Sequence, residues 1–430
     1  MCVAVTTDRK ATRQPLKVAV LGFGTVGSSL ARILCELAPP EVKLCCVFNR
    51  GIDRKRVSWV PSSVRWTESL DEVLACSPDL VVEVAGGLEP AGNWVRQALT
   101  AGTSVVTANK KLIAQQGPAL EELARRHGCQ LRYGAAVAGG VPVIPGVQQG
   151  LAGDRIHKLR GILNGTCNFI LSNMEAGSSF ESALRQAQEL GYAEADPTED
   201  VDGFDARAKL VILSRIGMRV EVLQEEIACA TIRTLTAIDF AYAKDLGATI
   251  RQISRAEVHD QALLASVGPM LIPRNSPLAW SRGTENMVIS SGQYGGDIVF
   301  SGYGAGGNPT AVAVLSDILD IAHGGSPVVI SSTRAKVDGE FVVPHYIRFV
   351  VEDRPGIVAR IAGFLAEQHI NINAILQKPG YAKLSLPFVV TVEPCRNSAL
   401  KRALAKIAEL DSMREPPLDL QMLEAEGSAP

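Results

Sequence analysis

The sequence predicts an α/β protein of about three domains, the first of which contains a doubly wound parallel sheet. The chain has 430 residues, and a domain usually contains about 100 to 200. Short apolar runs alternate with segments of helical apolar spacing from the start of the chain to about residue 134, a pattern typical of parallel strands joined by helices. A glycine-rich turn follows the first apolar run.

Apolar runs define the strands of the first domain. We expect these strands at 17–21, 42–48, 80–84, 104–108 and 130–134. Helical spacing predicts a helix over 26–37, which Pro39 and Pro40 stop, and another over 94–99. Strands that alternate with helices in this way favour a parallel sheet.

The pattern of apolar and polar residues changes at about residue 144. Polar helices are expected over 181–190 and 205–216, and strand-like runs follow at 287–290 and 298–300. Pro309 starts an apolar helix that we expect to return to the first domain. The predicted division is therefore 17–143 plus 309–330 for the first domain and 144–308 for a mixed α+β domain.

The pattern at the end of the chain predicts a third, separate module. Strand and helix patterns over 345–351, 356–367, 370–376, 384–392 and 399–410 fit a βαββαβ unit. We place this ligand-sensing module at 344–425. The first residues, 1–16, carry charges and no apolar core of a signal peptide, so we expect a disordered extension.

Composition excludes several classes of partner. With 43 Lys and Arg against 45 Asp and Glu, the net charge of -2 provides no basic field for nucleic acid or an anionic membrane. The weakly polar stretch 135–153 is broken by Pro142 and Pro145, so no membrane span is expected. Nine cysteines without a CxxC pair suit a reducing cytoplasm, and the six histidines lack the spacing of zinc ligands.

The glycine-rich turn carries the first chemical signal. Gly22, Gly24 and Gly27 form G-x-G-x-x-G directly after the first strand and at the start of the first helix. Such glycines allow a tight turn, the approach of a pyrophosphate to backbone N–H groups, and close packing of helix on sheet. The motif predicts a Rossmann-type dinucleotide site. A glycine turn without a ligand is the alternative.

Residues after the second strand bear on the choice of dinucleotide. Sites specific for NAD usually have Asp or Glu there to bind the ribose 2′-OH, whereas this chain has Asn49 and Arg50, followed by the basic run 54–56. A cation at this position can accept a 2′-phosphate. We therefore expect NADP(H) to be preferred and NAD(H) to be possible, unless the basic run is only a solvated loop.

An acid and an amine share one helical face in the second domain. Asp205 and Lys209 are four residues apart and are followed by apolar residues on the same face. Such a pair at the edge of a cleft is what a proton-transfer site requires, although a surface ion pair is the alternative. Lys110 follows a strand of the first domain at the edge where parallel sheets bind ligands. Cys167 has no histidine nearby in the sequence to activate it, which disfavours a nucleophilic role.

Several motifs together resemble one enzyme family. They are GFGTVG at 22–27, TANKK at 107–111, AAVAGGVP at 135–142, GILNGTCN at 161–168, ELGYAEADPTEDVDGFDARAKL at 189–210 and GYGAGGNPT at 302–310. From about residue 17 onward the sequence closely resembles homoserine dehydrogenase, in the long form that carries a C-terminal ACT regulatory domain. The resemblance implies interconversion of L-homoserine and L-aspartate 4-semialdehyde with a nicotinamide cofactor, in threonine and methionine biosynthesis.

The resemblance also implies roles for individual residues. Lys209 would be the catalytic proton donor and acceptor, and Asp205 would bind and orient the substrate. Glu194 would hold the substrate α-ammonium, with Asp200 and Thr166 in support.

Lys110 would lie by the reacting oxygen and the nicotinamide, so which lysine delivers the proton stays open. The implied cofactor contacts are Gly22, Phe23, Gly24, Thr25, Val26, Gly27, Arg50, Lys110, Gly191 and Gly306.

One departure from the family concerns a sodium ion. The matching backbone carbonyls belong to Val137, Gly139 and Val141, but Gly134 stands where the family commonly has Glu. The missing carboxylate removes the only formal anion that we expect at this site, so the sequence leaves sodium binding open.

The C-terminal module resembles the ACT signature at 351–358 and 370–373. The resemblance implies L-threonine as a feedback inhibitor and a homodimer or homotetramer, while a purely oligomeric role is the alternative. Two rival functions are an aspartate-semialdehyde dehydrogenase, which needs an activated cysteine, and a non-catalytic sensor. The two lysines and two carboxylates of the expected site argue against the sensor.

Overall fold

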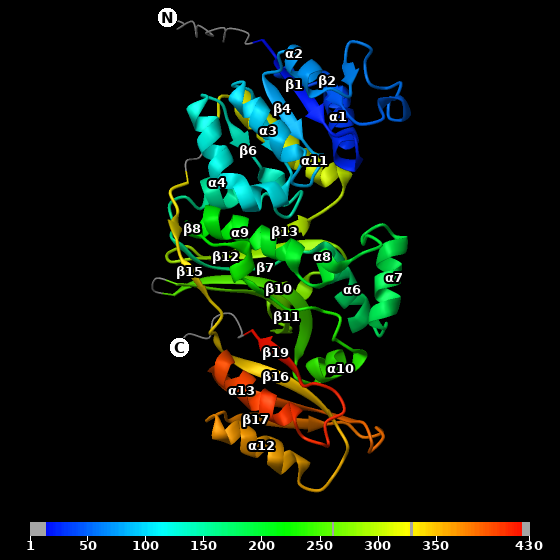
Figure 1. Cartoon of the computed structure of the whole chain (residues 1–430), viewed down its shortest axis with the longest axis vertical. Coiled ribbons are helices and arrows are strands. Elements are labelled where there is room, and N and C mark those ends of the chain that lie inside the picture. The colour runs from blue at the N-terminus through cyan, green and yellow to red at the C-terminus, as the bar shows by residue number, and fades with distance from the viewer. Residues whose placement is uncertain (1–13, 260–261, 327–329, 424–430) are drawn as a thin grey trace, which may run out of the picture. The chain divides into compact units, whose positions relative to one another are not determined.

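The structure is a computed structural model that describes residues 14–259, 262–326 and 330–423 (Figure 1). The chain divides into two compact units. The first unit comprises 1–142 and 305–329, and the second comprises 143–304 and 330–430. Most of the predicted N-terminal extension, 1–16, lies outside the described residues, and residue 16 already belongs to the first strand. Among the helices of the described residues, none is long and apolar enough to cross a membrane.

The first unit has a six-stranded parallel sheet in the order β3-β2-β1-β4-β5-β6. Its strands are β1 (Leu16–Leu21), β2 (Val42–Phe48), β3 (Arg65–Thr67), β4 (Leu80–Glu83), β5 (Ser104–Thr107) and β6 (Leu131–Arg132). Its main helices are α1 (Thr25–Leu37), α2 (Leu70–Ala75), α3 (Ala91–Thr100), α4 (Lys110–Arg126) and α11 (Gly307–Ala322). The strand order reverses between β1 and β4, which confirms the predicted doubly wound sheet.

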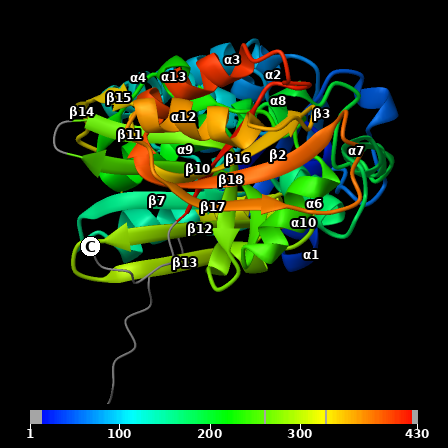
Figure 2. The ribbon, with the colours of Figure 1, turned by 90° about the horizontal axis from the view of Figure 1, so that it is seen from below.

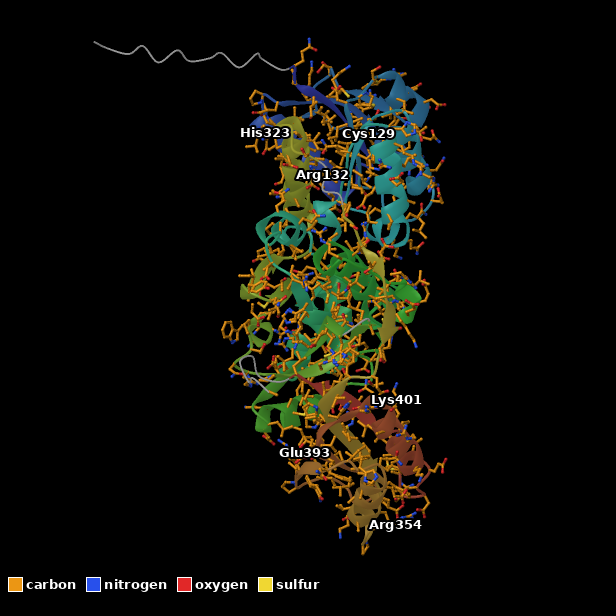
Figure 3. The ribbon with its side chains drawn as sticks, turned by 90° about the vertical axis from the view of Figure 1, so that its left-hand side faces the viewer. Cys129, Arg132, His323, Arg354, Glu393 and Lys401 are labelled. Atoms are coloured by element: carbon orange, nitrogen blue, oxygen red, sulfur yellow. The ribbon has the colours of Figure 1, made fainter. Side chains whose placement is uncertain are left out.

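The helix α11 returns to the first unit after the chain has built most of the second. Ala311, Val314 and Ile318 of α11 are buried in one core with Val18 and Val20 of β1. Arg132 of the edge strand β6 lies beside α11 (Figure 3). Its Nη2 lies 2.8 Å from Asp320 Oδ2, and this ion pair holds the end of α11 against the sheet edge. The helix begins two residues before Pro309, the predicted start.

The second unit is built on a sheet whose path is β13-β12-β7-β10-β11-β19-β16-β18-β17. The strands before the C-terminal module are β7 (Ile156–Ile162), β8 (Val220–Glu221), β9 (Ala228–Cys229), β10 (Ala248–His259), β11 (Ala262–Pro273), β12 (Glu285–Gly292), β13 (Gly296–Tyr303), β14 (Thr333–Arg334) and β15 (Lys336–Asp338). The helices are α5 (Val143–Pro145), α6 (Gly165–Glu175), α7 (Phe180–Glu189), α8 (Thr198–Val201), α9 (Phe204–Met218) and α10 (Ala237–Asp245). Figure 2 shows β7, β12 and β13 side by side, as their antiparallel pairing requires.

The long hairpin β10–β11 is the main element that sequence reasoning did not predict. Its two strands pair antiparallel from Ala248↔Pro273 to His259↔Ala262. Strand β10 contains Arg251 and Arg255 at buried positions, so the alternation of apolar and polar residues that marks a half-buried strand is missing.

The C-terminal βαββαβ unit has the predicted order of elements. They are β16 (Val342–Val351), α12 (Ile357–Glu367), β17 (Ile372–Gln377), β18 (Leu386–Arg396), α13 (Asn397–Ala408) and β19 (Leu418–Met422). This unit is not isolated in the structure, because β19 pairs with β11 and continues the same sheet. Tyr346 and Leu420 also share a core with Ile170 of α6. The C-terminal unit is therefore joined to the sheet that also contains β7, β10 and β12.

Candidate active site

The glycine turn after β1 has the three properties that a dinucleotide site needs. Gly22 has φ +105°, and a Cβ there would lie 2.9 Å from the Ala85 amide nitrogen. A Cβ on Gly27 would lie 1.9 Å from the Gly22 carbonyl oxygen, whereas a Cβ on Gly24 would meet no atom within 4 Å. The first and third glycines thus permit the turn and the packing of α1. The second leaves open space where a pyrophosphate can approach the backbone.

The other predicted cofactor contacts at this turn differ in which of their atoms are available to a cofactor. The Phe23 ring is buried between Trp59 and Trp66, so only its backbone is available to a cofactor. The Phe23 amide donates to Asn49 Oδ1 at 2.9 Å, which ties the turn to the end of β2. Thr25 and Val26 form the first turn of α1.

Gly306 lies beside this turn in the first unit. It has φ +117° and precedes α11, and a Cβ on its neighbour Gly307 would lie 3.0 Å from the Thr25 carbonyl oxygen. Gly191 belongs to the second unit, where it follows α7 with φ +75°.

Arg50 is exposed in the loop that follows β2. The same loop is held by a carboxylate, because Glu68 Oε1 accepts from the amides of Gly51 and Ile52 at 2.7 and 2.9 Å. The basic residues of 54–56 are also exposed. The loop can therefore offer cations to a 2′-phosphate, next to an acid that the sequence analysis did not consider.

Lys110 is the first residue of α4, just beyond the carboxyl end of β5. A buried acid organises this edge: Glu83 Oε2 accepts from Thr107 Oγ1 at 2.6 Å, and Glu83 Oε1 accepts from the amides of Ala85 and Gly86. Sequence reasoning missed Glu83. Its signal was a carboxylate at the end of an otherwise apolar strand, at the edge where such sheets bind ligands.

The predicted acid and amine meet on α9 in the second unit. Lys209 Nζ lies 2.8 Å from Asp205 Oδ2 and donates to the Leu163 carbonyl oxygen at 2.7 Å. Asp205 is 5% exposed and Lys209 is 8% exposed. The pair is therefore buried, unlike the solvated surface pair that the sequence left open.

Asn164 joins the two carboxylates of the site. Its Nδ2 donates to Asp200 Oδ1 at 2.6 Å and to Asp205 Oδ2 at 2.8 Å, and its Oδ1 accepts from the Cys167 amide at the start of α6. Burial raises the pKa of the Cys167 thiol well above its usual range, and Asp200 and Asp205 add to the effect. A neutral, fully buried thiol is not an activated nucleophile.

The structure brings Asp205 and Lys209 into contact and links Asp200 to them through Asn164. Thr166 Oγ1 donates to the Tyr192 carbonyl oxygen at 2.7 Å. Glu194 lies in the exposed loop after α7, where its carbonyl oxygen accepts from Gln188.

Two side-chain amides from strands β10 and β12 also support the site, and sequence reasoning missed both. Asn286 of β12 donates to the same Leu163 carbonyl oxygen at 2.9 Å, and Gln252 of β10 donates to the Asp200 carbonyl oxygen at 3.2 Å. Asn286 and Gln252 are buried, and a polar side chain at a buried strand position is the signal that could have found them.

A carboxylate does lie at Gly134, contrary to the expectation that this segment lacks a formal anion. Asp317 of α11 accepts from the Gly134 amide at 2.7 Å, and a Cβ on Gly134 would lie 2.7 Å from Asp317 Oδ1. Asp317 therefore occupies the space where a side chain at 134 would begin. The segment with Val137, Gly139 and Val141 turns tightly, since Ala138 and Gly139 both have positive φ. Carbonyl oxygens and carboxylates are the donor types that hard cations prefer, and Asp317 supplies a carboxylate beside Gly134.

No group of three or more His, Cys, Asp or Glu side chains that could hold a metal ion occurs within the described part of the chain.

Comparisons with known proteins agree across most of the chain. Residues 22–134 match the sequence family "Homoserine dehydrogenase, NAD binding domain", 142–319 match "Homoserine dehydrogenase" and 345–412 match "ACT domain". A homoserine dehydrogenase from Synechocystis sp. is 36% identical over 95% of this chain and 99% of its own length. One from Bacillus subtilis is 35% identical over 87% of this chain and 91% of its own length.

Two solved structures are similar as well. A homoserine dehydrogenase from Thiobacillus denitrificans superposes with a TM-score of 0.88 at 33% identity, covering 95% of this chain and 98% of its own. A hyperthermophilic archaeal homoserine dehydrogenase in complex with NADPH has a TM-score of 0.64 at 26% identity, covering 73% of this chain and 100% of its own.

Proposed function

Since the chain belongs to the homoserine dehydrogenase family, a family of NAD(P)-dependent oxidoreductases, we propose that Lys209 exchanges a proton with the reacting oxygen of its substrate. The substrates are L-homoserine and L-aspartate 4-semialdehyde. The single observation that carries the proposal is the buried contact of Lys209 with Asp205 at 2.8 Å. An ammonium beside a developing alkoxide both stabilises the charge and supplies the proton.

The neighbours of Lys209 have positioning roles in this proposal. Asp205 and the Leu163 carbonyl oxygen hold the ammonium in one place, and Asn164 holds Asp205. A group held in this way loses little freedom when the reaction occurs. Lys110, at the ligand-binding edge of the parallel sheet, is assigned to the nicotinamide side. When bound, the nicotinamide supplies or accepts the hydride.

The substrate's amino-acid group needs its own partners. We assign its α-ammonium to Glu194, with Asp200 and Thr166 in support, because an exposed carboxylate in the loop after α7 is accessible to an incoming cation. The amide network through Asn164 and Gln252 keeps the Asp200 segment in place.

The test of this function is oxidation of NADPH by the full chain with L-aspartate 4-semialdehyde, repeated with NADH and with added L-threonine. We expect turnover that needs both reactants. Turnover suppressed by L-threonine supports the ACT-like unit as a feedback module. A protein that binds NADPH but never turns over would instead favour a sensor.

The fused sheet changes how the regulatory role is best tested. Removal of the chain after about residue 330 would remove β19 and β15, which both pair with β11. It would therefore disturb the sheet whose strands β10 and β12 support the candidate site. A substitution in the ACT signature, such as Asn371→Ala, is cleaner because the Asn371 side chain donates only to Glu393 of the same module among the described residues.

We also propose that the enzyme is cytoplasmic and forms a homodimer or homotetramer.

We expect Arg50→Ala to lower kcat/KM for NADPH about tenfold or more and to leave kcat/KM for NADH unchanged. A charged hydrogen bond to the 2′-phosphate accounts for an effect of this size. Steady-state kinetics with both cofactors measure it. Arg185→Ala, which removes an exposed arginine of α7 outside this loop, is the control. Equal losses with NADPH and NADH would contradict the assignment of Arg50.

A second prediction concerns Asp317 and sodium. Burial raises the pKa of Asp317 to about 6, above its unfolded value, so the folded state binds the proton more tightly. The charged carboxylate therefore destabilises the fold above about pH 6, and this cost disappears as the pH falls toward 4. Asp317→Asn should remove a pH-dependent difference of at most about 3 kcal/mol in the free energy of unfolding.

A bound sodium ion would stabilise the charged form of Asp317. We therefore expect sodium chloride, compared with choline chloride at about pH 8, to raise the stability of the wild type and not of Asp317→Asn. Urea unfolding measures both effects, and Asp71→Asn, at an exposed carboxylate, is the control. An equal response of both proteins to sodium would remove Asp317 from the site.

A further inference from the structure

The sheet of the C-terminal βαββαβ unit is covered differently on its two faces. Ile347 of β16 belongs to one buried cluster with Ile361 of α12 and Ile407 of α13. Tyr346, the preceding residue on β16, points to the opposite face and belongs to a second cluster, which contains Phe240 of α10. This second face therefore shares its core with a helix that lies outside the C-terminal unit.

Polar contacts of β16 hold the start of α10. Asp239 lies in the first turn of α10 and is fully buried. Tyr346 Oη donates to Asp239 Oδ1 at 2.9 Å, and the guanidinium of Arg348 pairs with Asp239 Oδ2. Arg348 also donates to Thr236 Oγ1 at 2.7 Å and to the Thr234 carbonyl oxygen at 3.3 Å. Arg348 therefore fixes both α10 and the segment that leads into it.

The same segment, 231–236, contacts α8 at its other end. The Ile232 amide donates to the Val201 carbonyl oxygen at 3.0 Å, and Thr231 Oγ1 donates to Asp202 Oδ1 at 2.6 Å. Ile232 and Val201 are both fully buried. Helix α8 thus rests on a segment that β16 holds in place.

Helix α8 carries Asp200 into the candidate active site. Asp200 Oδ1 accepts from Asn164 Nδ2 at 2.6 Å, and the same Nδ2 donates to Asp205. Asp200 is bonded directly to Val201 in the chain, so a shift of the Val201 carbonyl group also moves Asp200. Direct contacts therefore run without a gap from Arg348 to Asp200, as coupling between two parts of a protein requires.

We propose that Arg348 is a positioning residue for the reaction, which fixes α8 through segment 231–236 and so keeps Asp200 in place for the amino-acid group of the substrate. The inference rests on the role proposed above for Asp200. A planar guanidinium can hold several acceptors in fixed directions, which an apolar side chain cannot do. Loss of Arg348 should therefore weaken substrate binding more than it slows the chemical step at Lys209.

The first experiment compares the full-length wild type, Arg348→Met and Arg402→Met by steady-state kinetics. Arg402 is an exposed arginine of α13 in the same C-terminal unit, and it controls for the loss of one charge. We expect Arg348→Met to raise KM for L-aspartate 4-semialdehyde about fivefold or more, with kcat lowered by less than about twofold. A merely structural role would instead reduce the fraction of active enzyme, and so lower kcat without changing KM.

Hydrogen exchange tests the same link without any turnover. The amides of Val201 and Asp202 donate to carbonyl oxygens one turn earlier in α8. We expect these amides, in a peptide covering 198–203, to exchange faster in Arg348→Met than in Arg402→Met, because α8 opens more often. A wild type without dehydrogenase activity would refute the proposed function, and the exchange rates would still decide whether Arg348 holds α8.

A double-mutant cycle tests the route through segment 231–236. Thr231→Val keeps the size of the side chain and removes its hydrogen bond to Asp202, so KM should rise, by a smaller factor than in Arg348→Met. If Arg348 and Thr231 act on α8 in series, KM of the double variant is lower than the product of the two single effects predicts.

The variant Arg348→Lys covers the case that Arg348→Met does not fold. Lysine keeps a cation beside the buried Asp239 but lacks the planar fork that reaches Thr234 and Thr236. Arg348→Lys should therefore fold and raise KM by an intermediate factor.

Three outcomes would overturn the proposal. A folded Arg348→Met or Arg348→Lys could keep both the KM and the exchange rates of the wild type. The loss could fall on kcat alone, with KM unchanged. The effects of Arg348→Met and Thr231→Val on KM could also multiply exactly as independent changes do, which would mean that the two residues act on the site by separate routes.

Discussion

Lys209→Met is expected to lower kcat about a thousandfold while NADPH still binds with its normal affinity. The methionine keeps much of the apolar stem but cannot donate a proton or stabilise negative charge on the substrate oxygen, and a positioned general acid contributes about 10² to 10⁴ in rate. The dinucleotide turn at 22–27 belongs to the first unit, so its affinity should not change. Stopped-flow or steady-state NADPH oxidation measures kcat, and fluorescence titration measures NADPH binding.

Two controls make the Lys209 result specific. Lys244→Met removes an exposed lysine of the same unit and should leave kcat unchanged. Asp205→Asn keeps the Lys209 amine but weakens the contact that holds it in place. We therefore expect a smaller loss of kcat and a shifted pH profile of kcat. A Lys209→Met enzyme that folds and retains most of its kcat would transfer the proton role to Lys110.

Gly27→Ala is expected to lower both the stability of the first unit and its affinity for NADPH. The new Cβ would lie 1.9 Å from the Gly22 carbonyl oxygen, so the turn or α1 must move, at a cost of about 1 to 3 kcal/mol or more. A displaced turn no longer presents its amides to a pyrophosphate. Urea unfolding and NADPH titration measure the two effects.

Gly24→Ala is the matched comparison for Gly27→Ala. A Cβ on Gly24 meets no protein atom within 4 Å and φ there is -86°, so stability should change by less than about 1 kcal/mol. The methyl group would occupy the space that a pyrophosphate needs, so the dissociation constant for NADPH should still rise about tenfold or more. Normal NADPH affinity in Gly24→Ala would show that the dinucleotide lies elsewhere.

Local patterns in the sequence were enough to predict most of the fold. The strands of the first unit are buried on both faces and therefore read as short continuous apolar runs, and the glycine spacing marks the turn between β1 and α1. The βαββαβ order at the end of the chain was predicted for the same reason. The pairing of Asp205 with Lys209 followed from helical spacing alone, because neighbours on a helix face need no tertiary information.

Contacts between distant segments could not be predicted in this way. Asp317 contacts the Gly134 amide only because α11 returns to the first unit, 183 residues further along the chain. Asn286 and Gln252 reach the candidate site from strands whose pairing was not foreseen. Strand β10 could not be predicted from hydrophobic periodicity, because polar residues occupy buried positions along it.

The sequence by itself determined the class of fold, the dinucleotide turn and the family, because each depends on residues that are close together in the chain. The tertiary structure alone decided which partners the buried charges have. Arg251 of β10 and Arg348 of β16 are both buried arginines within strands, yet Glu175 of α6 pairs with one and Asp239 of α10 pairs with the other. Whether a buried charge has a partner is a matter of packing, and packing brings together residues far apart in the sequence.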